Sequence, residues 1–132
     1  MKLRHVGLTS RSEKNSDKFF GELLGLEKLE PKTLPALLSQ ALFNVNADLK
    51  VINYMSDQAH FEVFIGTPEK SGVKPIEHVC LDVDDLAAFV QKCRSLNVNV
   101  LQVPKGDALL TFISDDDGNL FEIKERKSVV SS

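Results

Sequence analysis

Two histidines and two glutamates occupy matching places in the two halves of this sequence. His5 lies in R-H-V-G-L and His78 in E-H-V-C-L, while Glu62 lies in F-E-V-F and Glu122 in F-E-I-K. Imidazole nitrogens and carboxylate oxygens suit zinc, nickel, cobalt, manganese or ferrous iron. One such residue alone is more often structural or solvated. The matched set of four predicts a site for one divalent metal ion.

The strands that carry these residues should place all four side chains on the sheet face opposite the apolar one. Side chains alternate between the two faces of a strand, and the residues flanking each histidine and glutamate are mostly apolar. The apolar face should pack against helices. His5, Glu62, His78 and Glu122 are therefore expected on the opposite face.

Hydrophobic periodicity and turn residues predict the order of elements in each half. Ser12 opens the first helix and Gly25 ends it, and the second long helix begins after Asp84 or Asp85. The first half is predicted as strand Leu3–Thr9, that first helix, strand Leu26–Leu29, a short helix Ala36–Phe43 and an antiparallel pair Lys50–Tyr54 and Phe61–Ile65. The second is predicted as strand Ile76–Val83, helix Leu86–Leu96 and strands Val98–Val103, Leu109–Ile113 and Leu120–Ile123, the last two joined by the turn D-D-D-G-N.

Both halves are thus predicted to be βαβββ modules, covering about residues 1–68 and 75–126. The histidine and the glutamate are 57 residues apart in the first module and 44 apart in the second, a difference of 13. The short helix Ala36–Phe43 can supply this insertion. We expect one domain spanning residues 1–132, because the chain is short for two independent domains.

Composition limits the function classes. Of 132 residues, 42% are hydrophobic and 27% are charged, and the net charge of −3 lacks the basic surface that nucleic acid requires. No apolar run approaches membrane-spanning length, and no signal-peptide core follows the first residues. We expect a cytoplasmic protein with Cys80 and Cys93 as free thiols, a small-molecule substrate, and neither nucleic acid nor a membrane as partner.

Four further residues have side chains that could bind or react with a ligand, but the sequence gives them no clear role. Cys80 should share the face of His78, but a small buried thiol that fills space is the expected role rather than a fifth metal ligand. Tyr54, Lys105 and Asp107 could contact a substrate, and the sequence assigns them no function.

Five segments resemble the vicinal oxygen chelate superfamily, which contains glyoxalases, bleomycin-resistance proteins and dioxygenases. They are H-V-G-L, F-F-G-E-L-L-G-L-E, F-E-V-F, H-V-C-L-D-V-D-D and D-D-D-G-N-L-F-E-I, and the resemblance extends from Lys2 to Glu125. It implies an α+β fold in which two βαβββ modules form an open, barrel-like mixed sheet with helices on the outer face. It also implies that the first and last strands of each module supply the metal ligands, here His5, Glu62, His78 and Glu122.

A His, Glu, His, Glu set is similar to that of glyoxalase I, which implies a metal-dependent lyase or isomerase. Such an enzyme abstracts a proton next to a carbonyl while the metal chelates the enediolate, with Glu122 or Glu62 as the base. An epimerase of the methylmalonyl-CoA type and a non-enzymatic, drug-sequestering module remain alternatives. A ring-cleaving dioxygenase fits less well, because the second glutamate and the short chain depart from its pattern. No basic cluster suited to glutathione is evident, and a homodimer is expected.

Overall fold

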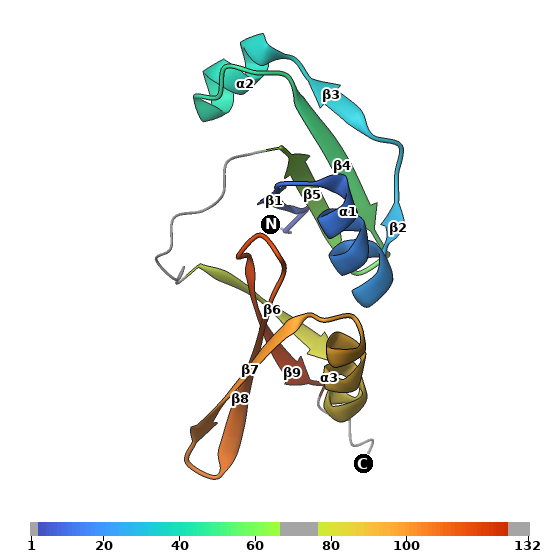
Figure 1. Ribbon diagram of the computed structural model, residues 1–132, viewed down its shortest axis with the longest axis vertical. Coiled ribbons are helices and arrows are strands. Elements are labelled where there is room, and N and C mark those ends of the chain that lie inside the picture. Colours follow the sequence, from blue (N-terminus) through green and yellow to red (C-terminus); the bar gives the residue numbers. More distant parts are fainter. Residues whose placement is uncertain (1–2, 67–76, 127–132) are drawn as a thin grey trace. The chain divides into compact units, whose positions relative to one another are not determined.

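The computed structural model describes residues 3–66 and 77–126 (Figure 1). The chain divides into two compact units, Met1–Ser71 and Gly72–Ser132. Each unit contains one sheet and its own helices. Within the described residues, no helix is long and apolar enough to cross a membrane.

The sheet of the first unit has the order β1-β5-β4-β2, with β3 also paired to β4. β1 runs parallel to β5, whereas β2, β3 and β5 are all antiparallel to β4. The strands are β1 (Val6–Ser10), β2 (Glu27–Lys28), β3 (Lys32–Leu34), β4 (Leu49–Met55) and β5 (His60–Ile65). The predicted antiparallel pair of β4 and β5 is confirmed.

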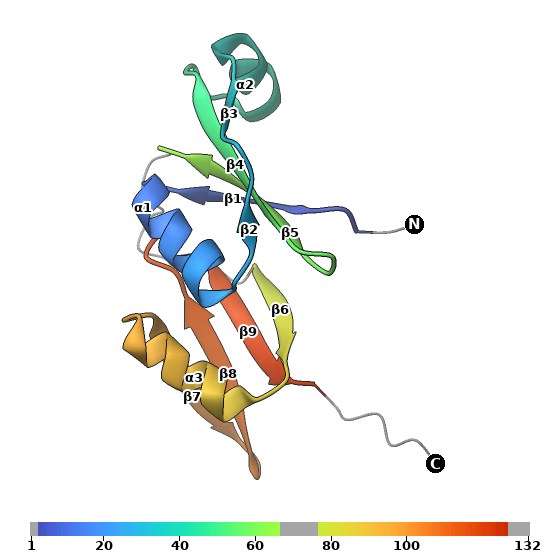
Figure 2. The ribbon, with the colours of Figure 1, turned by 90° about the vertical axis from the view of Figure 1, so that its right-hand side faces the viewer.

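One long helical segment covers the apolar face of this sheet (Figure 2). It starts at Ser12, whose side chain accepts a hydrogen bond from the Asn15 backbone, and runs through α1 (Glu13–Ser16) into the π-helical η1 (Asp17–Leu23). Phe20 is fully buried and stacks near Tyr54 and Phe61 of the sheet. The predicted Ser12 start is confirmed, and Gly25, with φ of +70°, follows the end of the helix.

The predicted second strand of the first unit is shorter than expected. β2 occupies only the middle of the expected Leu26–Leu29, and after Pro31 the chain pairs with β4 again as β3, a strand that the sequence did not predict. Proline cannot donate a ladder hydrogen bond, which explains the interruption. The short helix α2 (Ala36–Phe43) follows with the bounds that the sequence predicts.

The second unit is a βαβββ module without such an insertion. β6 (His78–Val83) lies parallel to β9 (Leu120–Glu125), which is antiparallel to β8 (Ala108–Ser114), which in turn pairs antiparallel with β7 (Asn99–Lys105). Asp85 caps α3 (Leu86–Ser95) by accepting from the Ala88 backbone. Val90 and Cys93 of α3 are buried, as are Phe121 and Ile123 of β9.

The predicted α+β fold of two βαβββ modules with helices on the apolar faces is confirmed. In each unit the first strand lies beside the last, and neither sheet closes on itself. The helix α2 accounts for the longer spacing in the first module, because β7 and β8 are joined directly by a turn at Gly106. The proposed module limits near residues 68 and 75 lie outside the described residues.

Candidate metal centre

In the first unit, His5 lies directly before β1, not within it as the predicted strand Leu3–Thr9 implied, and it lies close to Glu62 of β5. β1 and β5 are parallel with Gly7 opposite Glu62, and His5 lies two residues before Gly7. His5 Nε2 is 4.0 Å from Glu62 Oε1. The two side chains are 37% and 28% exposed, so a ligand can reach both.

In the second unit, the same arrangement recurs with different residues. β6 and β9 are parallel with Cys80 opposite Glu122, and His78 lies two residues before Cys80. The burial of β6 and β9 alternates, with His78 exposed, Glu122 half-buried and Phe121 and Ile123 fully buried. The ring of His78 lies edge-on to Phe112, with centroids 5.7 Å apart.

The two histidine–glutamate pairs are therefore equivalent in register. In each unit the histidine comes two residues before the residue paired with the glutamate. Two parallel strand pairs with different sequences thus present one imidazole and one carboxylate on the face away from the helix. Duplication of this geometry favours a shared task over two accidental surface pairs.

The side chains in each pair are of the kinds that bind a divalent transition metal. Neutral imidazole and carboxylate are the donors that zinc, manganese and ferrous iron accept. Among residues 3–66 and 77–126, no group of three or more His, Cys, Asp or Glu side chains is placed to hold a metal by itself. The structure brings together His5 with Glu62 and places His78 with Glu122 on one face.

Cys80 differs from its expected place. The thiol was expected to be buried, and this is wrong, because Cys80 is exposed on the face of His78 and lies opposite Glu122. Partial desolvation of the sulfur, and then the negative charge of Glu122, raise the pKa of the Cys80 thiol. Cys80 has no counterpart with a ligating side chain in the first unit, where Gly7 occupies the equivalent register position, so Cys80 stays outside the proposed set.

Tyr54 has a structural role on the opposite side of the first sheet. It is fully buried, accepts a hydrogen bond from Ser16 and donates one to Asp17, each 2.8 Å long. Burial is the main reason that the pKa of Tyr54 is raised. Tyr54 therefore anchors the α1–η1 helix to β4 and is not available to a substrate.

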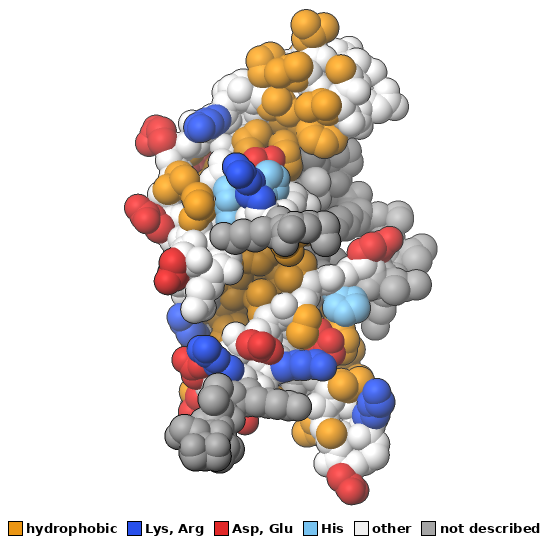
Figure 3. All heavy atoms as spheres, turned by 180° about the vertical axis from the view of Figure 1, so that it is seen from behind, with side chains coloured by type: hydrophobic (Ala, Val, Ile, Leu, Met, Phe, Trp, Pro, Cys, Tyr) orange, Lys and Arg blue, Asp and Glu red, His pale blue; other side chains and the backbone are white. Residues whose placement is uncertain are grey.

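Sequence reasoning missed His60 and Asn53. His60 lies two residues before Glu62 and so shares its face, and His60 Nε2 is 2.6 Å from Asn53 Oδ1. Asn53 in turn lies opposite Glu62 in the β4–β5 ladder. The signal was the third histidine of the chain at an even spacing from a predicted ligand. Histidine side chains of this unit gather on the face shown in Figure 3.

Glu62 also lines a cavity of about 280 Å³ within the first unit. Its walls come from β3, α2, β4 and β5, and they include Asn53 and Phe64. The carboxylate is thus placed beside a space in which a small molecule fits.

Comparisons with known proteins agree with this fold. Several solved structures share the fold over nearly the whole chain at low sequence identity. A glyoxalase family protein from Bacillus cereus has a TM-score of 0.75 with 14% identity, covering 97% of this chain and 95% of its own. A glyoxalase family protein from Enterococcus faecalis has a TM-score of 0.71 with 16% identity, covering 92% and 95%.

A third similar structure contains a metal ion. It is a mutant of the fosfomycin resistance protein FosX from Listeria monocytogenes, complexed with Mn(II) and 1S,2S-dihydroxypropylphosphonic acid. Its TM-score is 0.69 with 12% identity, covering 93% of this chain and 88% of its own. No curated protein matches the sequence significantly. The family model described as Glyoxalase/Bleomycin resistance protein/Dioxygenase superfamily matches residues 2–123. The chain therefore belongs to the glyoxalase, bleomycin resistance protein and dioxygenase superfamily.

Proposed function

We propose that this protein is a metal-dependent lyase or isomerase in which His5, Glu62, His78 and Glu122 hold one divalent ion. The observation that carries the proposal is the equivalent register of the two pairs, Gly7 opposite Glu62 and Cys80 opposite Glu122, with a histidine two residues before each. The Mn(II) in the similar FosX structure supports manganese as the first metal to test.

The histidines would serve as neutral nitrogen donors. His5 and His78 are both exposed at the face that carries the glutamates. A metal-binding imidazole needs its second ring nitrogen oriented by a neighbour or by water. When bound, the metal supplies a Lewis acid that polarises two neighbouring oxygens of a substrate.

The glutamates would move the proton. A carboxylate beside the substrate can accept a proton from a carbon next to a carbonyl and return it to a neighbouring position. Glu122 is the first candidate and Glu62 the second. Both are half-buried, so each can reach a small molecule while being partly shielded from water.

The test is to measure metal binding by elemental analysis and titration calorimetry on protein purified without a histidine tag. We expect about one Mn²⁺ or Zn²⁺ per chain. His5→Ala, Glu62→Gln, His78→Ala and Glu122→Gln should each weaken binding by more than about 100-fold, because losing even an outer hydrogen-bond partner costs about 10- to 100-fold. Glu77→Gln, next to His78 but outside the set, is the matched control and should bind like the wild type.

Activity is then measured as exchange of carbon-bound hydrogen for deuterium, followed by NMR. The substrates are small α-hydroxy carbonyl compounds and hemithioacetals. Exchange that depends on metal and is lost in Glu122→Gln supports the proposal. A wild-type protein that takes up no metal even after loading contradicts it, and a ligand-sequestering module then becomes the better explanation.

The proposal includes the assembly of the site. We propose a single glyoxalase-like domain that acts as a homodimer, with the two half-sites completing one metal centre. Mixing His5→Ala with His78→Ala protein tests this. If the centre forms between subunits, the mixture should recover metal binding, whereas a centre formed within one chain leaves every site defective.

A further inference from the structure

The helix α2 forms one wall of a cavity in the first unit. The described part of the second unit has no helix at the equivalent position. The open cavity of about 280 Å³ is lined by residues of β3, α2, β4 and β5, and α2 has no counterpart between β7 and β8. Ligand pockets usually have volumes of roughly 300–1,000 Å³, and this cavity, slightly smaller, has room only for a small ligand. All of its lining residues lie in the first unit.

One part of the lining is apolar and partly exposed. Leu42 and Phe43 of α2 are 64% and 50% exposed, and the Phe43 ring lies edge-on to Phe64 with centroids 5.3 Å apart. Val51 completes this wall. Figure 3 shows hydrophobic side chains gathered over α2. Covering such a surface with an apolar ligand group is favourable, because it removes apolar area from water.

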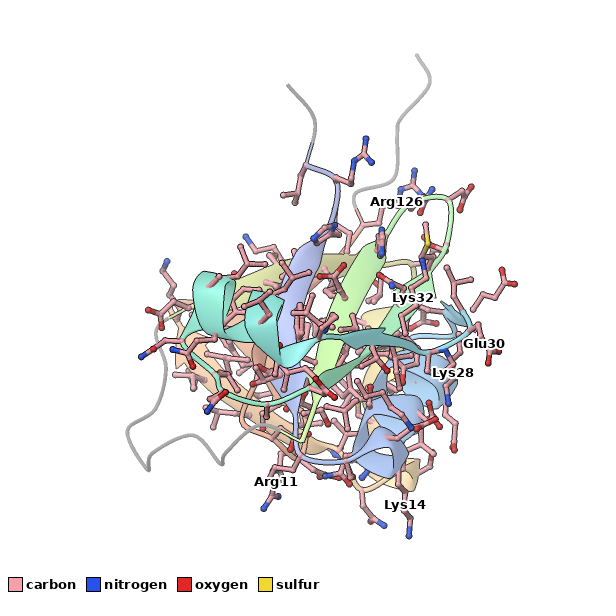
Figure 4. The ribbon with its side chains drawn as sticks, turned by 90° about the horizontal axis from the view of Figure 1, so that it is seen from above. Arg11, Lys14, Lys28, Glu30, Lys32 and Arg126 are labelled. Atoms are coloured by element: carbon pink, nitrogen blue, oxygen red, sulfur yellow. The ribbon has the colours of Figure 1, made fainter. Side chains whose placement is uncertain are left out.

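The other part of the lining carries one cation. Lys32 lies opposite Val51 in the β3–β4 ladder and lines the cavity. Within the described part of the chain it has no ion-pair partner, whereas Lys28 pairs with Glu13 and Asp17. The two lysines lie at different places along the same edge (Figure 4). Lys32 is therefore available to form an ion pair with a negatively charged group of a ligand.

Two polar groups lie deeper on the sheet. Asn53 and Glu62 are directly opposite each other and both line the cavity. With Asn53 Oδ1 engaged by His60, the amide nitrogen remains as a hydrogen-bond donor. A ligand seated on the apolar wall is thereby brought beside a carboxylate that the proposed function assigns to the metal.

We propose that this cavity binds the apolar body of a small organic acid, pairs its acidic group with Lys32 and directs its reacting carbon toward Glu62. This names the substrate class of the proposed metal-dependent reaction and rests on that function for the role of Glu62 alone. The aromatic wall favours a ring or a branched aliphatic group over a straight polar chain.

A matched pair of fluorescent probes tests the recognition. Anilinonaphthalene sulfonate has an apolar body with an acidic group, and N-phenylnaphthylamine has the same body without it. Binding is measured by fluorescence titration in a chelating buffer. Lys32→Gln should weaken the sulfonate up to about fivefold, as for an exposed ion pair, and leave the neutral probe unchanged.

Variants of α2 locate the binding. Leu42→Ser should weaken both probes by about three- to tenfold, because it removes apolar surface from the wall. Leu37→Ser, on the same helix but outside the lining and 82% exposed, is the control and should change neither. Both changes are at exposed positions, so folding should be retained. Equal weakening by both variants would overturn the proposal, as would a wild type that binds neither probe.

Three further outcomes separate this inference from its alternatives. If Leu42→Ser changes the sedimentation behaviour of the protein but not its affinity for the probes, the α2 surface is an interface between copies and the proposal fails. If probes bind as expected but no metal is taken up, the cavity stands and the proposed metal-dependent function fails. If metal binds and the probes do not, the cavity proposal alone is overturned.

Discussion

The ring of His60 packs against the ring of His5, with centroids 5.2 Å apart and planes inclined at 54°. His60 is itself held by Asn53, with a short contact of 2.6 Å between ring nitrogen and amide oxygen. The residue at the same place in the second unit is Leu120, because His60 precedes Phe61 as Leu120 precedes Phe121. The first unit thus supports its proposed histidine ligand with a polar pair, and the second unit uses an apolar residue.

Replacing His60 by the residue of the second unit should loosen His5 without removing a proposed ligand. We expect His60→Leu to weaken Mn²⁺ binding by about three- to tenfold. This is smaller than the roughly 10- to 100-fold cost of losing a hydrogen-bonded outer partner, because His60 contacts His5 through its ring. Titration calorimetry measures the change. Gln58→Ala, in the preceding exposed turn, is the control, and an unchanged affinity in His60→Leu would refute the supporting role.

The buried faces of the strands and the starts of the helices were predictable from the sequence. Alternation of apolar residues in Phe61–Ile65 and Leu120–Ile123 fixed which face is buried, and Ser12 and Asp85 marked where the helices begin. The ends of strands were less predictable. β7 extends through Pro104 to Lys105, because its pairing with β8 continues past the apolar stretch.

For the candidate site, the sequence predicted only on which face of its sheet each proposed ligand lies. Period-two alternation places His5, Glu62, His78 and Glu122 away from the helices, which the burial pattern bears out. The exposure of Cys80 was missed, because an isolated cysteine between apolar residues resembles a core residue. The cavity beside Glu62 was also missed, because it depends on where α2 packs rather than on any local pattern.

The hydrogen bonds of Tyr54 should contribute to stability rather than to the site. Tyr54→Phe removes a donor to Asp17 and an acceptor for buried Ser16. We expect a loss of about 1–3 kcal/mol in the free energy of unfolding, because a buried group left without a partner is costly. Chemical denaturation measures it. Metal stoichiometry should not change, since Tyr54 faces the helix, and a variant as stable as the wild type would disprove the anchoring role.

Asp115 should fix the hairpin that carries Glu122. Its buried carboxylate accepts hydrogen bonds from the backbones of Asp117 and Asn119 and from the Asn119 side chain, at 2.7–3.0 Å. Asp115→Ala should lower the free energy of unfolding by about 3 kcal/mol, because three charge-assisted bonds are lost. Denaturant titration against the exposed neighbour variant Asp116→Ala provides the comparison. Equal stability of the two variants would show that the turn holds its shape without Asp115.

Glu13 should make the stability of the first unit depend on pH in the acidic range. Hydrogen bonds from Lys28 and then Lys50, at 2.5 and 2.8 Å, lower the pKa of Glu13 from 4.5 to about 2. A lowered carboxylate pKa means that the stabilisation is fully present above about pH 4.5 and is lost as the pH falls toward 2. Glu13→Gln should therefore lower Tm at pH 7 and flatten its fall between these two pH values.

Glu22→Gln, an exposed change on the same helical segment, is the control for Glu13→Gln and should follow the wild-type curve. The effect should be modest and should shrink at high salt, because Glu13 and its partner lysines are close to solvent. Thermal unfolding at low and high salt gives both readings. Parallel curves for wild type and Glu13→Gln across pH 2 to 4.5 would mean that the two lysines do not hold this carboxylate in solution.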